Sequence, residues 1–384
     1  MTTPNILIFM TDQQRACSVL PDDPYKAITP VLDEFRKDSV TFSRAFCPSP
    51  HCCPSRASFM TGLMPTQHGV WHNVNVTNAI TRGLKGHVRP WSVDMREAGY
   101  RMLFTGKWHV SNYQLPEDYG WNDGPVDHPV PTPEEQEEAA RTREMKRLRT
   151  QAVGDAGPER GRGEILRPGY TPYVHYGSDE NPFNDRTVVE RALDMFDGLT
   201  GDEPWCMYVG TLGPHDPYIP PMRFLDMYDG IEFELPDTFD DPMDDKPALY
   251  RRTRDRFNQL SREEHKEAIK HYLAFCSYED WLFGRLIDKL KERGEYDDTV
   301  ILYVSDHGDY LGDHGLWCKG LPSFLSNYHV PAILKMPDGE KSVVRDELVS
   351  LCDFGPTFLE MAGIESPVEF AGQSLVPLLG MGPG

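Results

Sequence analysis

Six short apolar runs rich in β-branched residues recur along the chain and predict the strands of a sheet. They cover residues 5–10, 40–46, 101–104, 205–211, 299–304 and 331–335. Within the runs the hydrophobic residues are largely consecutive and do not alternate with polar ones, which is typical of strands buried on both faces. Stretches with helical spacing separate the runs. The pattern therefore predicts an α/β fold, in which helices cover both faces of a large, mostly parallel sheet.

The clearest predicted helix follows Ser261. The sequence Ser-Arg-Glu-Glu at 261–264 is a capping box, which satisfies two of the backbone amides that are free at the start of a helix. Apolar residues recur at helical spacing from Ile269 to Leu290, and Gly294 is suited to end the helix. We expect the aromatic residues of this helix to pack in the core.

Two segments interrupt the alternation of strands and helices. Residues 112–185 are rich in Pro, Gly, Glu and Arg, and residues 222–260 are rich in Asp, Pro and Met. Neither composition suits a central strand. Insertions of this kind lie at the rim of a site or are solvated loops without a role. We predict one catalytic domain over residues 1–384, with both segments as rim insertions.

Composition and charge narrow the range of partners. The 384 residues include 39 Lys and Arg against 60 Asp and Glu, which gives a formal net charge of −21. A field of this sign repels nucleic acids and anionic membranes, so we expect neither as a partner. No apolar run is long enough to span a bilayer. Residues 6–10 are too short for a signal-peptide core and have no basic region before them, so we expect a cytoplasmic protein.

Polar residues that suit a metal ion follow two of the predicted strands. Asp12 and Gln13 come shortly after the run 5–10, and Asp306 and His307 follow the run 299–304. Open α/β sheets bind their ligands at the carboxyl ends of the strands. Carboxylates and an imidazole at one such edge are able to hold a hard divalent cation.

The most specific motif is Cys-Cys-Pro-Ser-Arg at 52–56, followed by Thr-Gly-Leu-Met-Pro at 61–65. Adjacent cysteines alone leave a disulfide or a reactive thiol open, and the absence of a Cys-x-x-Cys pair disfavours zinc. Cys-x-Pro-Ser-Arg with a downstream Thr-Gly-x-x-Pro resembles the signature of the formylglycine-dependent sulfatases of the alkaline-phosphatase-like superfamily. The resemblance implies that a separate maturation enzyme oxidises Cys52 to formylglycine.

The resemblance extends along most of the chain in the same order. Its further stretches are Gly-Lys-Trp-His at 106–109, Pro-His-Asp-Pro at 214–217, Asp-His-Gly at 306–308, Gly-Asp-His-Gly-Leu-Trp-Cys-Lys-Gly at 312–320 and Gly-Gln-Ser-Leu at 372–375. It is strongest to the branch of choline-sulfatases and phosphonate monoester hydrolases. The family usually has a C-terminal subdomain, which we expect to be short or absent here.

The resemblance implies a metal site and departs from the family at two of its positions. Asp12, Gln13, Asp306 and His307 would bind one divalent cation together with residue 52. Familiar sulfatases have an aspartate in place of Gln13, and many have an asparagine in place of His307. Oxygen ligands make Ca²⁺ the first expectation, and the imidazole brings in Mn²⁺, with Mg²⁺ also open.

The resemblance also implies catalytic roles. A hydrated formylglycine at position 52 would attack sulfur with one hydroxyl group, and the second hydroxyl would collapse to the aldehyde and expel sulfate. Arg56 would hold the hydrate, Lys107 would bind the sulfate, and His109 would act as the base for the collapse. His215 and Lys319 would bracket the leaving oxygen, with one of them acting as the acid.

Further residues and functions stay open from the sequence. We expect Asn73 to line the pocket as well, and we assign four other polar residues to loop hydrogen bonds: His68, Asp309, Asp313 and His314. The expected substrate is a sulfated sugar or a small organic sulfate ester. One alternative is a phosphonate or phosphate ester hydrolase on the same fold, since those esters are also tetrahedral anions. The other is an inactive carbohydrate-binding relative, which would not need this set of residues.

Overall fold

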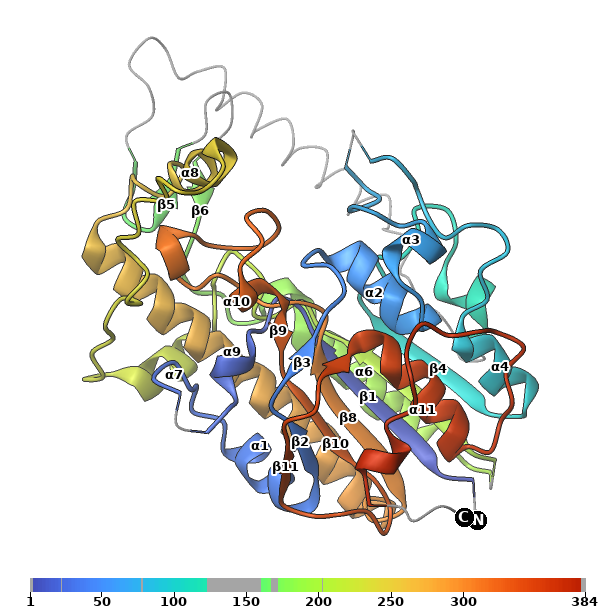
Figure 1. The fold of residues 1–384 in the computed structure, drawn as a ribbon. Helices are drawn as coiled ribbons and strands as arrows, with labels where there is room; N and C mark the ends of the chain where they lie inside the picture. The colour runs from blue at the N-terminus through green and yellow to red at the C-terminus, as the bar shows by residue number, and fades with distance from the viewer. Residues whose placement is uncertain are drawn as a thin grey trace, which may run out of the picture.

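The computed structural model describes residues 3–21, 23–76, 79–122, 160–166, 172–201 and 203–380. Its centre is a seven-stranded sheet with the order β11-β2-β10-β8-β1-β7-β4 (Figure 1). The strands are β1 (Asn5–Thr11), β2 (Val40–Phe42), β4 (Arg101–Gly106), β7 (Trp205–Gly210), β8 (Thr299–Ser305), β10 (Ala332–Lys335) and β11 (Val343–Arg345).

The four strands at the centre and on one side of this sheet run parallel. β1 pairs in parallel with both β8 and β7, and β7 pairs in parallel with β4. β10 is antiparallel to both of its neighbours. Every residue of β7 and β8 is buried, which accounts for their unbroken hydrophobic runs. The mostly parallel α/β sheet predicted from the sequence is confirmed.

The prediction of one strand over 40–46 was wrong. β2 ends at Phe42, Ser43 and Arg44 form a turn, and β3 (Ala45–Phe46) then joins a separate three-stranded sheet. In that sheet β3 lies between β12 (Val349–Ser350) and β9 (His329–Val330). The turn residues Ser43 and Arg44 are polar and Arg44 is exposed, so the sequence does mark the change of sheet, which the prediction of one run overlooked.

Helices cover both faces of the central sheet. Alternate residues of β1 face opposite sides: Leu7 and Phe9 belong to one hydrophobic cluster, and Ile6 and Ile8 belong to the other. The first cluster is covered by α1 (Pro30–Phe35), α6 (Asp185–Asp197) and α9 (Arg262–Glu292). The second is covered by α2 (Cys52–Thr61), α4 (Trp91–Glu97) and α11 (Phe354–Met361) (Figure 1). Within the described ranges, no helix has the length and hydrophobicity needed to cross a membrane.

Helix α9 has the boundaries that the sequence predicts. The hydroxyl of Ser261 accepts from the backbone amide of Glu264 at 3.2 Å, and the carboxylate of Glu264 accepts from the backbone amide of Ser261 at 2.9 Å. The helix ends at Glu292, and Gly294 has a left-handed backbone with φ of 69°. Tyr272 and Phe275 are buried in the core.

The described parts of the two insertions add no strand to the central sheet. The first insertion contributes the two-stranded sheet of β5 (Glu164–Ile165) and β6 (Tyr173–Val174), and its residues 123–159 and 167–171 lie outside the described ranges. The second contains α7 (Met222–Leu225) and α8 (Ala248–Arg254). The remaining short helices are α3 (Pro65–His68) and α10 (Leu325–Tyr328).

A buried carboxylate on α9 fixes the start of α1. Asp280 is 1% exposed, and its two oxygens accept from the backbone amides of Val31 at 3.0 Å and Leu32 at 2.7 Å. These amides belong to the first turn of α1, which has no side-chain cap of its own. A residue of α9 therefore supplies the cap from another part of the chain.

We expect Asp280→Ala to destabilise the protein by about 1–3 kcal/mol, because it leaves two buried amides without an acceptor. Urea unfolding measures the change. Asp288→Ala is the matched control, since Asp288 is exposed on the same helix and should alter stability by less than about 0.5 kcal/mol. Equal stability of the two variants would show that Asp280 is not needed as a cap.

Candidate active site

The carboxyl ends of four parallel strands bring the predicted residues to one edge of the sheet (Figure 1). Asp12 follows β1, Lys107 follows β4, and Asp306 follows β8. His215 lies in the loop after β7. Cys52 is the first residue of α2 and is 1% exposed. Segments that are far apart in the sequence therefore meet because of the strand order.

The backbone at this edge adopts conformations that let neighbouring segments of the main chain approach each other closely. Gly106 has φ of 94°, and a Cβ atom there would overlap the carbonyl oxygen of Gly210. The amide of Lys107 donates to that same oxygen at 2.9 Å. Gln13 and His109 have left-handed backbones with φ of 66° and 53°. Such conformations cost about 1–3 kcal/mol each and concentrate at functional sites.

Four buried side chains form a cluster that fits a divalent cation. One atom each from Asp12, Cys52, Asp306 and His307 lies within 4.8 Å of the others. The sulfur of Cys52 is 3.4 Å from Nε2 of His307 and 3.8 Å from Oδ1 of Asp12. Nδ1 of His307 is 2.9 Å from the carbonyl oxygen of Gly308, which only accepts, so the neutral ring carries its proton on Nδ1. The lone pair of Nε2 then faces the cluster, as metal binding requires.

Buried cations balance the two aspartates of this cluster. Nε of Arg56 donates to Asp306 at 2.7 Å, and the guanidinium also lies 3.4 Å from Asp12. The amino group of Lys107 forms an ion pair with Asp12. The remaining Arg56 donors reach the hydroxyl of Tyr208 at 2.9 Å and the carbonyl of Lys107 at 3.0 Å. Arg56 is fully buried, so these partners hold its planar group in one orientation.

Charges around Cys52 favour its ionised form. Burial alone would raise the pKa of the thiol, but Lys107 and Lys319, followed by His307 and His109, hold that pKa well below its usual value. The same two lysines hold the pKa of Asp12 below its usual value, against burial and the neighbouring Cys52. The edge of the sheet is therefore positively charged around residue 52, although the whole chain is acidic.

Gln13 links the cluster to Lys319. Its side-chain oxygen accepts from Nζ of Lys319 at 2.8 Å, and its side-chain nitrogen donates to Asp309 at 2.6 Å. Asp309 also accepts from the hydroxyl of Tyr218 at 2.6 Å and from the amide of Leu311 at 2.7 Å. The assignment of Asp309 to loop hydrogen bonding therefore missed its second role, which is to orient Gln13. Its place three residues after Asp306 was the available signal.

His215, one of the two predicted acids, and His109, the predicted base, have different surroundings. Nδ1 of His215 is 2.5 Å from the carbonyl oxygen of Asp216 and 3.4 Å from its carboxylate. Burial and Lys319 lower the pKa of His215, but Asp216 and Asp12 outweigh them and raise it above the usual value. The ring nitrogens of His109 make no hydrogen bond of normal geometry among the described residues, although His109 helps to lower the pKa of Cys52.

Asn73 lies at the N-terminus of α2. Its side-chain oxygen accepts from the backbone amide of Cys53 at 3.1 Å, so it serves as an acceptor in the first turn of α2. His68 is 3.0 Å from the hydroxyl of Ser58, and His314 is 2.7 Å from Asp241. The contact of His68 thus joins α3 to α2, and that of His314 joins two loops.

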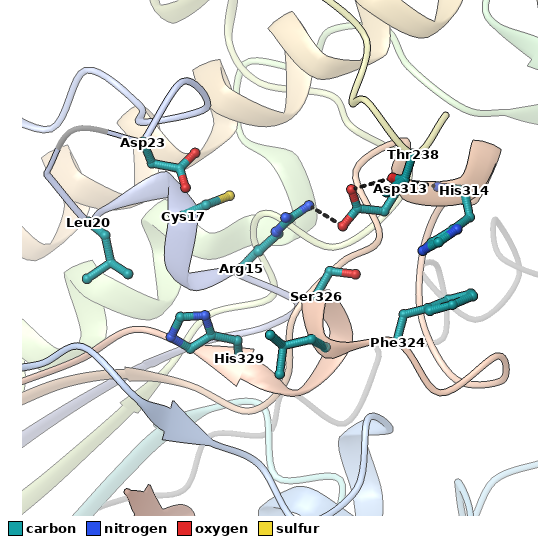
Figure 2. A pocket seen from close by; sticks show the side chains of 11 residues that line it. Arg15, Cys17, Leu20, Asp23, Thr238, Asp313, His314, Phe324, Ser326 and His329 are labelled. Atoms are coloured by element: carbon teal, nitrogen blue, oxygen red, sulfur yellow. Dashed lines mark hydrogen bonds and ion pairs between the residues drawn. The ribbon is translucent and has the colours of Figure 1, made fainter. Parts of the chain in front are cut away.

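A separate pocket of about 300 Å³ lies on the outer side of the loop that carries Lys319. Figure 2 shows its wall, where Arg15 and Asp313 form an ion pair of 3.0 Å and Thr238 donates to the same carboxylate. The ring of His314 stacks on Phe324 with centroids 3.8 Å apart. None of the predicted catalytic or metal-binding residues lines this pocket.

Comparisons with known proteins agree with the geometry. The family model described as Sulfatase matches residues 4–364. A choline-sulfatase of Rhizobium meliloti (strain 1021) is 31% identical over 405 residues, which cover 99% of this chain and 72% of that protein. A phosphonate monoester hydrolase from Silicibacter pomeroyi has the same fold, with a TM-score of 0.73 at 24% identity over 99% of this chain and 77% of that one. A protein solved with its substrate D-glucosamine-2-N,6-O-disulfate has a TM-score of 0.72 at 20% identity, over 98% of this chain and 80% of that one.

We expect the buried cluster to bind one divalent cation and to be stabilised by it. Adding Ca²⁺ or Mn²⁺ to metal-stripped protein should raise the melting temperature, since binding at 100 times Kd contributes about 2.7 kcal/mol. Asp306→Asn should remove this rise, because it takes one carboxylate from the cluster.

Asp313→Asn is the control, since Asp313 lines the separate pocket and should keep the rise. Calorimetric scans with and without metal measure the difference. An equal metal-dependent rise in Asp306→Asn and Asp313→Asn would place the cation elsewhere.

Proposed function

Because the chain belongs to the sulfatase family and is a sulfuric ester hydrolase, we propose that formylglycine at residue 52 is the nucleophile with which it cleaves sulfate monoesters. One observation carries this proposal. Cys52 is buried at the start of α2 among Asp12, Asp306 and His307, and Lys107 and Lys319 surround it with positive charge. A sulfuryl group placed at this atom would meet both lysines.

The aldehyde hydrate and a bound divalent cation would together supply a nucleophilic oxygen and charge neutralisation at sulfur. The side chains contribute the rest of the chemistry. Lys107 neutralises the sulfuryl oxygens, and Arg56, whose Nε donates to Asp306, would hold the hydrate formed at residue 52. His109, whose ring nitrogens are free of normal hydrogen bonds among the described residues, takes the proton from the second hydroxyl of residue 52.

His215 and Lys319 act on the leaving oxygen. The raised pKa of His215 keeps its ring protonated at higher pH than a free histidine, which suits a general acid. Burial lowers the pKa of Lys319, but Cys52, Asp12 and Asp216 outweigh it, so this lysine stays charged beside the same position. His215 therefore donates the proton, and Lys319 stabilises the negative charge that develops on the departing oxygen.

The cation is Ca²⁺ in this proposal, with Mn²⁺ as the alternative. Two carboxylates and the oxygens of a converted residue 52 are hard ligands that suit Ca²⁺. The imidazole of His307 is the one feature that favours Mn²⁺. Gln13 would be the neutral member of the set, although its side-chain oxygen also accepts from Lys319. Elemental analysis of active protein distinguishes the two ions.

The substrate is a sulfated sugar or a small organic sulfate. The relatives include a choline-sulfatase, and one structural neighbour was solved with a disulfated glucosamine as its substrate. The net charge of −21 disfavours long, highly sulfated polymers. We place the enzyme in the cytoplasm together with a maturation enzyme that converts Cys52.

A phosphonate or phosphate ester hydrolase is the second candidate, because a phosphonate monoester hydrolase has the same fold. Catalytic efficiencies on matched aryl sulfate, phosphonate and phosphate diester substrates distinguish the two. An inactive carbohydrate-binding protein would have no use for Cys52, His109 and Lys319 together at one edge of the sheet.

We expect Cys52, and not Cys53, to be converted to the aldehyde when the protein is produced with a maturation enzyme. Cys53 points elsewhere, since its sulfur accepts from the amide of Val74 at 3.3 Å and burial raises its pKa to about 12. Peptide mass spectrometry should find the thiol-to-aldehyde mass change at residue 52. Activity that survives in Cys52→Ala, with Cys53→Ala as the control, would refute the mechanism.

We expect His215→Ala and Lys319→Ala to slow sugar or alkyl sulfates far more than nitrophenyl sulfate, whose good leaving group hardly needs a proton. A general acid contributes about 10²–10⁴-fold, so the contrast is measurable in kcat/KM. Lys107→Ala is the comparison, because sulfate charge must be neutralised for every substrate and both rates should fall alike. Equal losses on both substrates for His215→Ala would show that the acid is another residue.

A further inference from the structure

A buried pair of carboxyl groups lies beneath the loop that carries His215. Asp185 is the first residue of α6, Glu279 lies near the middle of α9, and each is 0% exposed. Neither belongs to the cation cluster or to the catalytic set described above. Burying two carboxyl groups together is unfavourable unless they share a proton or find hydrogen-bond donors.

Asp185 obtains its donors from the loop. One oxygen accepts from the backbone amide of Leu212 at 2.8 Å, and the other accepts from the amide of Gly213 at 2.7 Å. Burial raises the pKa of Asp185 to about 7, and burial together with Asp185 raises the pKa of Glu279 well above its usual value. Burial therefore favours a shared proton on this pair, and the two amides favour the charged form of Asp185.

The same two loop residues continue into the active site. The carbonyl of Gly213 accepts from the amide of Asp12 at 3.0 Å, and the carbonyl of Leu212 accepts from the amide of His215 at 3.0 Å. The peptide unit between Leu212 and Gly213 is thus held by Asp185 at its amide and joined to His215 at its carbonyl. The carbonyl of Gly213, in the next peptide unit, reaches Asp12. Backbone geometry transmits the position of Asp185 directly to His215.

Packing around the loop leaves it little freedom. A Cβ atom at Gly213 would overlap Oε1 of Glu279 and the ring of Phe275. Phe183 packs its ring edgewise on His215 with centroids 6.2 Å apart, and it stacks on Phe275 at 6.0 Å. Glu279 and Phe275, both on α9, therefore support the loop from below.

We propose that Asp185, through the amides of Leu212 and Gly213, is a positioning residue that places His215 for protonation of the leaving group. This inference rests on the proposed role of His215, but its structural part does not. Asp185 touches neither the substrate nor the reacting atoms. Its effect passes through the amides of Leu212 and Gly213.

Asp185→Asn tests the structural part by hydrogen exchange. The asparagine keeps the size of the side chain but turns one acceptor oxygen into a donor, so one of the two amides loses its partner. We expect faster exchange in peptides that cover residues 211–217. Asp280→Asn is the matched control, because Asp280 is also buried and also accepts from two backbone amides, those of α1. It should leave exchange at 211–217 unchanged.

The kinetic part compares two substrates, one with a poor leaving group and one with a good leaving group. Small misplacement of a catalytic group costs about 10²-fold, so Asp185→Asn should lose about that factor on a sugar sulfate and far less on nitrophenyl sulfate. In a His215→Ala background, Asp185→Asn should add no further leaving-group dependence. Asp280→Asn should affect both substrates equally.

Gly213→Ala perturbs the same loop without removing a charge. It serves as the second variant if Asp185→Asn does not fold. It should show the same leaving-group signature. Unchanged exchange at 211–217 in both variants would overturn the inference. If exchange is faster in the variants but the unaltered protein cleaves no sulfate ester, the role of Asp185 in positioning the loop stands and the proposed function is refuted.

Discussion

The site depends on the balance between two buried aspartates and the two cations that face them. Asp12 and Asp306 are 0% exposed at the ends of neighbouring strands, and Arg56 and Lys107 are their partners. Removing one partner from a buried ion pair typically costs about 3–5 kcal/mol, because the remaining charge is left without compensation. A divalent cation held by Asp12 and Asp306 would compete with Lys107 for Asp12, which would leave the amino group of Lys107 available to an anion.

The strands fix the positions of the residues at this edge, and the loops carry other residues farther from the sheet. β1 and β8 are adjacent and fully paired from Asn5 to Thr11, so Asp12 and Asp306 have a fixed separation. The residues proposed to approach the substrate, His109 and His215, lie beyond the strands on segments with left-handed backbone or with support from other helices. The fold thus separates the groups that hold charge from the groups that move protons.

The sequence correctly predicted the strands, helix boundaries and polar positions that depend on local patterns of residues. Consecutive apolar residues located β1 and β8, and the polar residues just after them were correctly expected at one sheet edge. The capping box located α9 to within a residue. The break between β2 and β3 was missed because the two polar turn residues, Ser43 and Arg44, form a break short enough to be read as part of one apolar run. The partnerships of Asp185, Tyr208 and Asp309 were also missed, since each joins segments distant in the chain and leaves no periodic signal.

The acidity of the chain and the positive site are compatible because they act over different distances. The net charge of −21 is spread over a surface screened within about 8 Å at physiological ionic strength. Lys107, Lys319 and Arg56 act inside a region where burial weakens screening, so their influence on residue 52 exceeds that of distant carboxylates. The acidic surface would therefore repel a large polyanion that lies along it, while a small anion that reaches residue 52 would meet a field of the opposite sign. Local arrangement, and not overall charge, decides which anion this site accepts.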